Sequence, residues 1–351
     1  MIDTSEALAA FLPELDSATR VAIDTEADSL HCYFEKLCLI QLSLPGCDAL
    51  IDPLASFSLE PLFEALAKRE QVLHGMDYDL RLLRRVGFPD SDSIFDTMIA
   101  ARLIGEPEFS LAALLQKYFS VTLAKGSQKA NWARRPLSLL MEEYAINDTH
   151  YLLDLADILA GKLRELERWE WFQQSCARAM ESTKTDRDRD VENAWRITGS
   201  SDLRGRAAAV LRALWRWRDT EARAVDRPPF HILQNEKLIE AAVQLDAGER
   251  VSLPHLSSSR ARRFSEAAQF GLNSAPEEWP QPVRKARGRL TREQEIMVQN
   301  LKTRRDAAAV KLQIDSSLIA PKATLEAIAA DQATWEKKLL PWQRDLLAPA
   351  P

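Results

Sequence analysis

Short apolar runs alternate with amphipathic helical patterns over the first 165 residues of this 351-residue chain. The apolar runs are β-branched or aliphatic, are bounded by polar turns, and are too short to be helices. Four of them predict strands: RVAIDTEA (20–27), KLCLIQLSL (36–44), ALIDPL (49–54) and QVLHGM (71–76). Helical spacing in LEPLFEALAKRE (59–70) falls between the last two. This alternation is typical of an α/β domain in which helices flank a sheet.

Beyond about residue 165 the strand-like runs cease, and the sequence predicts only helices. A length of 351 residues fits two or three domains. We expect four regions: an α/β domain (1–165), a helical connector (166–198), a compact all-α domain (199–275) and a C-terminal helical region (286–351). The stretch APEEWPQPVRKARGRL (275–290), with three prolines and four basic residues, interrupts the helical pattern and predicts a linker.

The composition is that of an ordinary globular protein, with 46% apolar and 28% charged residues. No apolar run approaches the roughly 18 residues of a membrane span, and the N-terminus lacks the basic region of a signal peptide, so we expect a cytoplasmic protein without membrane contact. The four cysteines show no CxxC pairing and no histidines at zinc spacing, which predicts reduced thiols. A net charge of −6 argues against nonspecific coating of nucleic acid but allows a local basic groove.

Two carboxylates end the first predicted strand. Residues two apart on a strand point to the same face, so Asp24 and Glu26 lie side by side. Like charges at this spacing raise one another's pKa unless a cation lies between them. For an isolated pair, the more frequent explanation is that one acid caps a turn and the other faces solvent. Further acidic residues elsewhere in the sequence are needed to favour a cation site.

Two further stretches supply acidic residues. In HGMDYDLRLL (74–83) a strand gives way to a helix, with Asp77 and Asp79 at the junction. In YAINDTHYLLDL (144–155), Tyr144 and Asp148 are four apart on one helix face. Four converging carboxylates would suit two Mg²⁺ or Mn²⁺ ions, which prefer oxygen ligands, and such a pair supports phosphoryl displacement.

The stretches DTEAD, HGMDYDL and YAINDTHYLL resemble the three exonuclease motifs of the DEDD family in its tyrosine branch. DTEADSLHCYFEKLCLIQLS and KANWARRPLS resemble ribonuclease D and its exosome-associated relatives. The resemblance implies a ribonuclease-H-like fold, a mixed sheet flanked by helices. It implies five catalytic residues, which are Asp24, Glu26, Asp79, Tyr144 and Asp148. The four carboxylates among them would hold the metals. Asp79 is preferred to Asp77 because it directly precedes an apolar-rich helix.

The resemblance implies a metal-dependent 3′-to-5′ exoribonuclease that trims structured RNAs such as transfer RNA precursors and releases nucleoside 5′-monophosphates. One metal and Tyr144 would position the attacking water, and the second metal would stabilise the departing 3′ oxygen. A DNA 3′ exonuclease shares all three motifs, but the chain has no polymerase or helicase signature. An inactive RNA-binding adaptor is a third possibility, which the presence of every acidic residue disfavours.

The stretch LRALWRWRDTEARAVDRPPFHILQNEKLIEAA (211–242) resembles the HRDC domain, the helical module that ribonuclease D shares with RecQ-type helicases. Leu214 and Trp215 are expected in its core. Arg216 lies among arginines at helical spacing that could contact RNA phosphates or simply form a charged surface. The last 60 or so residues could be a second, reduced HRDC-like unit, could brace the catalytic domain, or could pair with another subunit, so the oligomeric state stays open.

Several other residues are candidates for the substrate-binding surface. The basic segment around Trp132, with Lys125 and Lys129, could hold the RNA backbone, while Trp132 could stack on a base or pack against the third-motif helix. His31, Tyr33 and His74 are further candidates for contact with the terminal nucleotide, although a histidine on an apolar strand is more often buried and satisfied. Asp96 could be a fifth metal ligand, but its position before a helix favours an N-cap.

Overall fold

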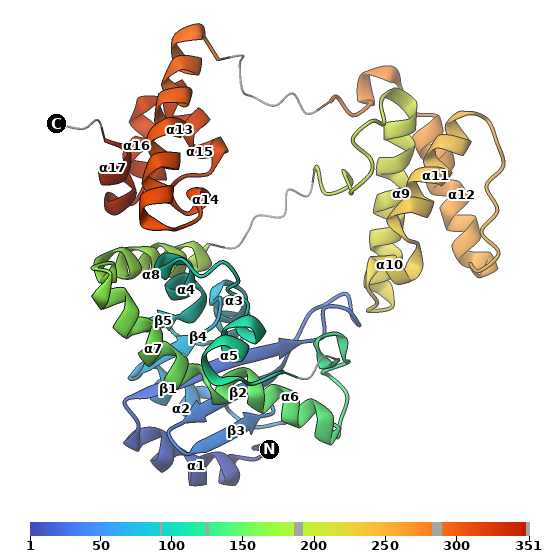
Figure 1. Ribbon diagram of the computed structural model, residues 1–351. Helices are drawn as coiled ribbons and strands as arrows, with labels where there is room; N and C mark the ends of the chain where they lie inside the picture. Colours follow the sequence, from blue (N-terminus) through green and yellow to red (C-terminus); the bar gives the residue numbers. More distant parts are fainter. Residues whose placement is uncertain (92, 124–125, 186–191, 283–289, 349–351) are drawn as a thin grey trace. The chain divides into compact units, whose positions relative to one another are not determined.

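The computed structural model describes residues 1–91, 93–123, 126–185, 192–282 and 290–348 (Figure 1). It divides into two compact units. The first comprises Met1–Ala27, Leu37–Asp186 and Gly288–Pro351, and the second comprises Asp28–Lys36 and Arg187–Arg287. The C-terminal region thus belongs to the same compact unit as the α/β domain. Parts of the expected connector and linker, residues 186–191 and 283–289, lie outside the described residues.

A five-stranded sheet forms the centre of the first unit. Its strands are β1 (Arg20–Ala27), β2 (Leu37–Leu44), β3 (Cys47–Ile51), β4 (Glu70–Leu73) and β5 (Ile94–Asp96). They lie in the order β3-β2-β1-β4-β5, with β1, β2 and β3 antiparallel in sequence and β4 and β5 parallel to β1. The predicted mixed sheet flanked by helices is confirmed. Strand β5 was not predicted, because its three residues are too short to show a period.

Nine helical segments of the first unit lie within the described residues before position 186. They are α1 (Ser5–Ser17), α2 (Glu60–Ala67), α3 (Asp77–Arg85), α4 (Thr97–Ile104), α5 (Leu111–Phe119), the 3₁₀ turn η1 (Ser127–Lys129), α6 (Leu139–His150), α7 (Leu152–Glu165) and α8 (Trp169–Lys184). Helices α6 and α7 pack against β1 and β2. The sequence suggested one continuous helix there, whereas the structure interrupts it at Tyr151.

The C-terminal helices share the hydrophobic core of the first unit. They are α13 (Arg292–Leu312), α14 (Ser316–Ile319), α15 (Lys322–Ala330), the 3₁₀ turn η3 (Gln332–Thr334), α16 (Trp335–Lys338) and α17 (Pro341–Leu347). Trp171 of α8 stacks on Trp342 with ring centroids 4.9 Å apart. Gly105 ends α4 at a φ of 91°, and a Cβ there would overlap the backbone carbonyl of Gln313. These contacts support the bracing alternative for the C-terminal region.

The second unit is a helical domain with its own core. It contains α9 (Gly205–Ala224), α10 (Pro229–Ile232), α11 (Asn235–Asp246), α12 (Ser258–Leu272) and the 3₁₀ turn η2 (Pro276–Glu278). Gly271 lets α12 approach α9 closely, because a Cβ there would lie 2.6 Å from Val210 Cα. The segment Asp28–Lys36 packs on this domain, where Asp226 Oδ1 accepts the backbone N–H groups of Tyr33 and Phe34, each at 3.0 Å.

Among the helices of the described ranges, none is both long enough and apolar enough to cross a membrane.

Candidate active site

Strand β1 places the first two carboxylates. Asp24 pairs with Gln41 and Glu26 with Leu39 in the neighbouring strand β2, while β4 pairs with the first part of the strand, Arg20–Ala22. The ladder is irregular between Glu26 and Ala27, where β1 leaves the regular register. The two acids therefore stand at the end of a fixed strand, as the sequence predicted.

Helix α3 supplies the next carboxylate. The Asp79 residue is buried, with 6% exposure, and its Oδ1 accepts a 2.6 Å hydrogen bond from Thr25 Oγ1. The side chain of Asp77 is 43% exposed and forms an ion pair of 3.1 Å with Arg81. Of these two candidates, Asp79 is therefore the one whose carboxylate is directed toward β1.

Helix α6 brings Asp148 to the acids of β1. One carboxylate oxygen from each of Asp24, Glu26 and Asp148 lies within 4.8 Å of the others. Tyr144 lies one helical turn before Asp148, and the Asp148 carboxylate and the Gln128 side chain of η1 are near enough to the phenol to influence its pKa. The structure thus gathers the five residues predicted to be catalytic into one region of the first unit.

Burial and mutual repulsion perturb the pKa values of the four acids strongly. Burial, followed by the charges of Asp79, Asp148 and Glu26, raises the pKa of Asp24 well above its ordinary value. Burial and the neighbouring carboxylates raise the pKa of Glu26 to about 9. Burial also raises the pKa of Asp148 to about 7 and that of Asp79 to about 6. Each shift reports an acid that would release its proton more readily beside a positive charge.

The donor set fits hard divalent cations. It consists of anionic oxygens only, and the three carboxylates within 4.8 Å of one another can share an ion. Mg²⁺ and Mn²⁺ prefer such ligands over nitrogen or sulfur. Among the described residues, this is the one group of three or more acids, histidines or cysteines whose donor atoms come that close together.

Asp96 supports the site through backbone contacts. Its carboxylate accepts the N–H groups of Met98 and Ile99 as the N-cap of α4, at 2.8 and 3.0 Å. The same carboxylate accepts those of Gly75 and Met76, at 3.2 and 2.8 Å. The predicted N-cap is therefore present, and it also fixes the turn that leads from β4 into α3.

Trp132 cannot present its ring to a base, because its exposure is 1%. Its ring packs beside Tyr144, with centroids 6.1 Å apart, which is the second of the two roles considered for it. The substrate-stacking role is therefore wrong in this structure. Arg135 is also committed to the fold, since its guanidinium contacts Asp52 and donates at 2.7 Å to the Trp132 carbonyl.

The other predicted substrate residues are separated between the two units. Lys129 is exposed in η1, whereas Lys125 lies outside the described residues. His74 is half-buried, and its Nδ1 lies 2.9 Å from Thr97 Oγ1. In the second unit, Arg216 is exposed on α9. A substrate contact by any of them stays a prediction.

His31 and Tyr33 lie in the segment that packs on the helical domain. The Tyr33 hydroxyl donates to Asp219 Oδ1 at 2.8 Å, and the His31 carbonyl lies 3.5 Å from the Arg227 guanidinium, which donates to it. Trp215, expected in the core, is only partly buried and packs against the core from outside. Tyr33 and Trp215 line a pocket in the second unit.

Thr25 and Gln128 are site residues that sequence reasoning missed. Thr25 lies inside the DTE stretch but points its hydroxyl at Asp79, which is distant in sequence. Gln128 follows a glycine in a loop with no helical or strand period. The threonine between two acids is a signal that could have been weighed, whereas the position of Gln128 depends on tertiary structure alone.

Comparison with known families agrees with this geometry. A family model described as 3′-5′ exonuclease matches residues 1–164, and one described as HRDC domain matches residues 207–265. A half-buried carboxylate cluster beside a tyrosine, on a mixed sheet with an attached HRDC domain, defines a 3′-5′ exonuclease of the metal-dependent DEDD class.

Relatives narrow the class further. Ribonuclease D of Zymomonas mobilis is 30% identical, over 99% of this chain and 91% of that protein. Ribonuclease D of a Jannaschia species is 32% identical, over 69% of this chain and 64% of that protein. The crystal structure of Escherichia coli RNase D, an exoribonuclease involved in structured RNA processing, matches with a TM-score of 0.69 and 26% identity, over 97% of this chain and 91% of that one. The chain belongs to the ribonuclease D family and is a 3′-5′ exoribonuclease, which confirms the prediction from its motifs.

Proposed function

We propose that this protein trims the 3′ ends of structured RNAs, transfer RNA precursors among them, and releases nucleoside 5′-monophosphates. The observation that carries the proposal is the half-buried carboxylate cluster beside Tyr144, whose all-oxygen donor set suits two Mg²⁺ or Mn²⁺ ions. The Escherichia coli relative is described as acting in structured RNA processing, which supports the substrate class. The free thiols of all four cysteines suit the reducing cytoplasm, the location that we propose.

In the proposed mechanism, Asp24, Glu26, Asp79 and Asp148 hold the ions. When bound, the ions lower the pKa of the attacking water and stabilise charge on the departing 3′ oxygen. The phenol of Tyr144 orients the attacking water, and it does so as a protonated group. Burial and the charge of Asp148 raise the pKa of Tyr144, so its O–H is retained at neutral pH. Asp148 and Gln128 lie beside that hydroxyl and are the groups that would direct it.

The experiment that tests the activity compares matched substrates. A 5′-labelled single-stranded RNA and its DNA counterpart are incubated with Mg²⁺, with Mn²⁺ or with EDTA, and the products are resolved at single-nucleotide resolution. We expect a metal-dependent ladder that shortens the RNA from its 3′ end and is much weaker on DNA, because the terminal 2′-OH distinguishes the two. Equal digestion of both would favour a general nuclease, and absence of cleavage with either metal would favour an inactive adaptor.

Two variants assign the activity to the cluster. Asp24→Asn removes one ligand charge with little change of shape and should abolish the ladder while RNA binding persists. Asp77→Asn is the matched control, since that acid is on α3 but its side chain is 43% exposed and pairs with Arg81. Normal turnover by Asp24→Asn, or equal loss in both variants, would contradict the assignment.

The substrate class needs its own comparison. A transfer RNA precursor with a short 3′ extension and an unstructured RNA of the same 3′ sequence are offered together. Trimming that stops near the mature end of the precursor, under conditions that degrade the unstructured RNA further, is the expected result. Indifference to the folded body of the RNA would contradict the proposed substrate.

A further inference from the structure

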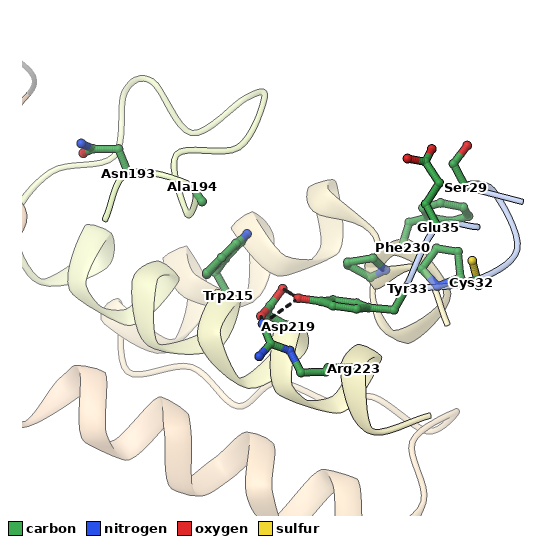
Figure 2. A pocket seen from close by; sticks show the side chains of 12 residues that line it. Ser29, Cys32, Tyr33, Glu35, Asn193, Ala194, Trp215, Asp219, Arg223 and Phe230 are labelled. Atoms are coloured by element: carbon green, nitrogen blue, oxygen red, sulfur yellow. Dashed lines mark hydrogen bonds and ion pairs between the residues drawn. The ribbon is translucent and has the colours of Figure 1, made fainter. Parts of the chain in front are cut away.

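The second unit contains an aromatic pocket that the catalytic cluster does not use (Figure 2). It lies between the segment Asp28–Lys36 and the helices α9 and α10, and its volume is about 630 Å³. Pockets that bind small organic groups typically measure about 300–1,000 Å³. The side chains on which the following argument rests are Ser29, Tyr33, Trp215, Asp219, Arg223 and Phe230.

One wall of the pocket is rigid. Trp215, Asp219 and Arg223 follow one another at intervals of four residues, so α9 presents them along one face. Figure 2 shows Tyr33 reaching this face, where its hydroxyl donates to Asp219 Oδ1 at 2.8 Å. The Arg223 guanidinium donates to the same hydroxyl at 3.1 Å and lies 5.4 Å from the Tyr33 ring centroid. The aromatic ring of Tyr33 is therefore held in place before any ligand arrives.

The opposite wall offers an accessible aromatic ring. Phe230 in α10 is 45% exposed, although an aromatic side chain of this size gains from burial. Trp215 is partly buried and packs against the core of the domain. Tyr33, Trp215 and Phe230 thus supply aromatic surface to one cavity. Flat aromatic surface of this kind is what an unpaired nucleobase stacks on.

The charges around the pocket restrict its ligand. Asp219 and Glu35 line it together with Arg223, so the pocket is neither purely apolar nor purely basic. Two carboxylates disfavour a free anion such as inorganic phosphate, and three charged groups disfavour an acyl chain. A nucleobase satisfies both conditions, because its faces are apolar and its edges carry hydrogen-bond donors and acceptors.

The chain itself links the pocket to the catalytic acids. Ser29, which lines the pocket, follows Glu26 by three residues, and three residues of extended chain span at most about 11 Å. The short connection keeps Ser29 within that span of Glu26 whatever the arrangement of the two units. We propose that this pocket holds one unpaired base of the RNA, upstream of the terminal nucleotide, and so helps to feed single-stranded 3′ ends to the site. The inference rests on the exoribonuclease function proposed above.

The test places a fluorescent base along the RNA. The adenine analogue 2-aminopurine changes its fluorescence on stacking and is introduced at successive positions from the 3′ end. The RNAs are bound to the full-length Asp24→Asn protein, which should not cleave them. We expect one position, at a fixed number of nucleotides from the 3′ end, to respond, and the response to disappear when Phe230→Ala is added. The affinity should fall about five-fold or more, as when one base–aromatic contact is lost.

Matched controls remove similar groups elsewhere in the helical domain. Val243→Ala removes an apolar side chain that is 49% exposed on α11. Arg223→Gln removes the hydrogen bond to the Tyr33 hydroxyl and should also weaken binding. Its control is Arg262→Gln, which removes a guanidinium from α12 whose side chain is 76% exposed. Both controls should leave RNA affinity within about two-fold of the parent, as surface substitutions usually do.

Two outcomes would overturn the proposal while the exoribonuclease function stands. In the first, wild-type protein shortens RNA but no 2-aminopurine position responds to Phe230→Ala. In the second, Phe230→Ala weakens binding of free adenosine 5′-monophosphate with no preferred position along RNA, which would indicate a product site. Failure of the wild-type protein to shorten RNA at all would instead refute the proposed function.

Discussion

Removing one negative charge from the carboxylate cluster should stabilise the metal-free protein while it abolishes cleavage. Asp24 is the acid to change, because Asp79, Asp148 and Glu26 all raise its pKa in addition to burial. Asp24→Asn keeps the shape of the side chain and removes both its charge and its proton equilibrium. In the wild-type protein the folded state keeps Asp24 protonated at pH values where the unfolded chain releases the proton. The variant has no such proton, so its stability should depend less on pH.

The expected size follows from proton linkage. A group whose folded pKa is above its unfolded pKa favours the folded state at low pH, and that contribution is lost as the pH rises through the folded value. The pKa of Glu26, which is raised from 4.5 to about 9, sets the pH range over which the cluster should lose this contribution. Each retained proton costs up to about 1.4 kcal/mol per pH unit, so pH 5 to pH 8 corresponds to about 4 kcal/mol at most. Because the cluster is partly open to solvent, we expect about half of that, or about 4 °C in melting temperature.

The assay is thermal unfolding followed by circular dichroism in EDTA between pH 5 and pH 8. Wild type should lose stability as the pH rises, Asp24→Asn should lose less, and the two should converge near pH 5. Asp77→Asn, which changes an acid already paired with Arg81, should follow wild type. Added Mg²⁺ should stabilise wild type most at high pH and Asp24→Asn little. Parallel pH profiles for wild type and Asp24→Asn would refute the argument that the cluster is electrostatically strained.

Three further changes test individual contacts. Tyr144→Phe should lower the cleavage rate about 100-fold or more with Mg²⁺ affinity unchanged in calorimetry; a smaller loss would argue against the phenol orienting water. Asp96→Ala leaves the N–H groups at the start of α4 and the N–H of Met76 without an acceptor. The free energy of unfolding in urea should therefore fall by about 2–3 kcal/mol, and an unchanged value would mean that these contacts are weak. Arg168→Met removes the 2.7 Å hydrogen bond to the Leu312 carbonyl and should make the C-terminal helices more sensitive to limited proteolysis; an unchanged digestion pattern would contradict the bracing role.

The site residues were predictable from sequence where acidic side chains recur at the spacing of one face of a strand or a helix. A strand that ends in Asp24 and Glu26 can be recognised because alternation fixes the face of each residue. The helix that carries Tyr144 and Asp148 can be recognised for the same reason, since a spacing of four places both on one face. The choice of Asp79 over Asp77 depended on the family motif, because both acids stand in the first turn of α3.

The features that sequence could not supply depend on contacts between distant segments. β5 has three residues, too few to show a period, and it exists because β4 pairs with it. The break between α6 and α7 at Tyr151 has no glycine or proline to mark it. Trp132 lies in a loop that looks exposed, yet packing beside Tyr144 buries it to 1%. In each case tertiary contacts outweigh the local pattern.

A cluster of mutually repelling acids can persist only if the elements that carry it are held from elsewhere. β1 is paired with β2 along the acids and with β4 over Arg20–Ala22, and the turn before α3 is fixed by Asp96. The first turn of α6 is capped by Ser138. These supports act on the backbone and leave the carboxylate oxygens free to serve as ligands. The arrangement therefore combines a rigid scaffold with an unbalanced charge, which is the condition under which a divalent ion both binds tightly and stabilises the fold.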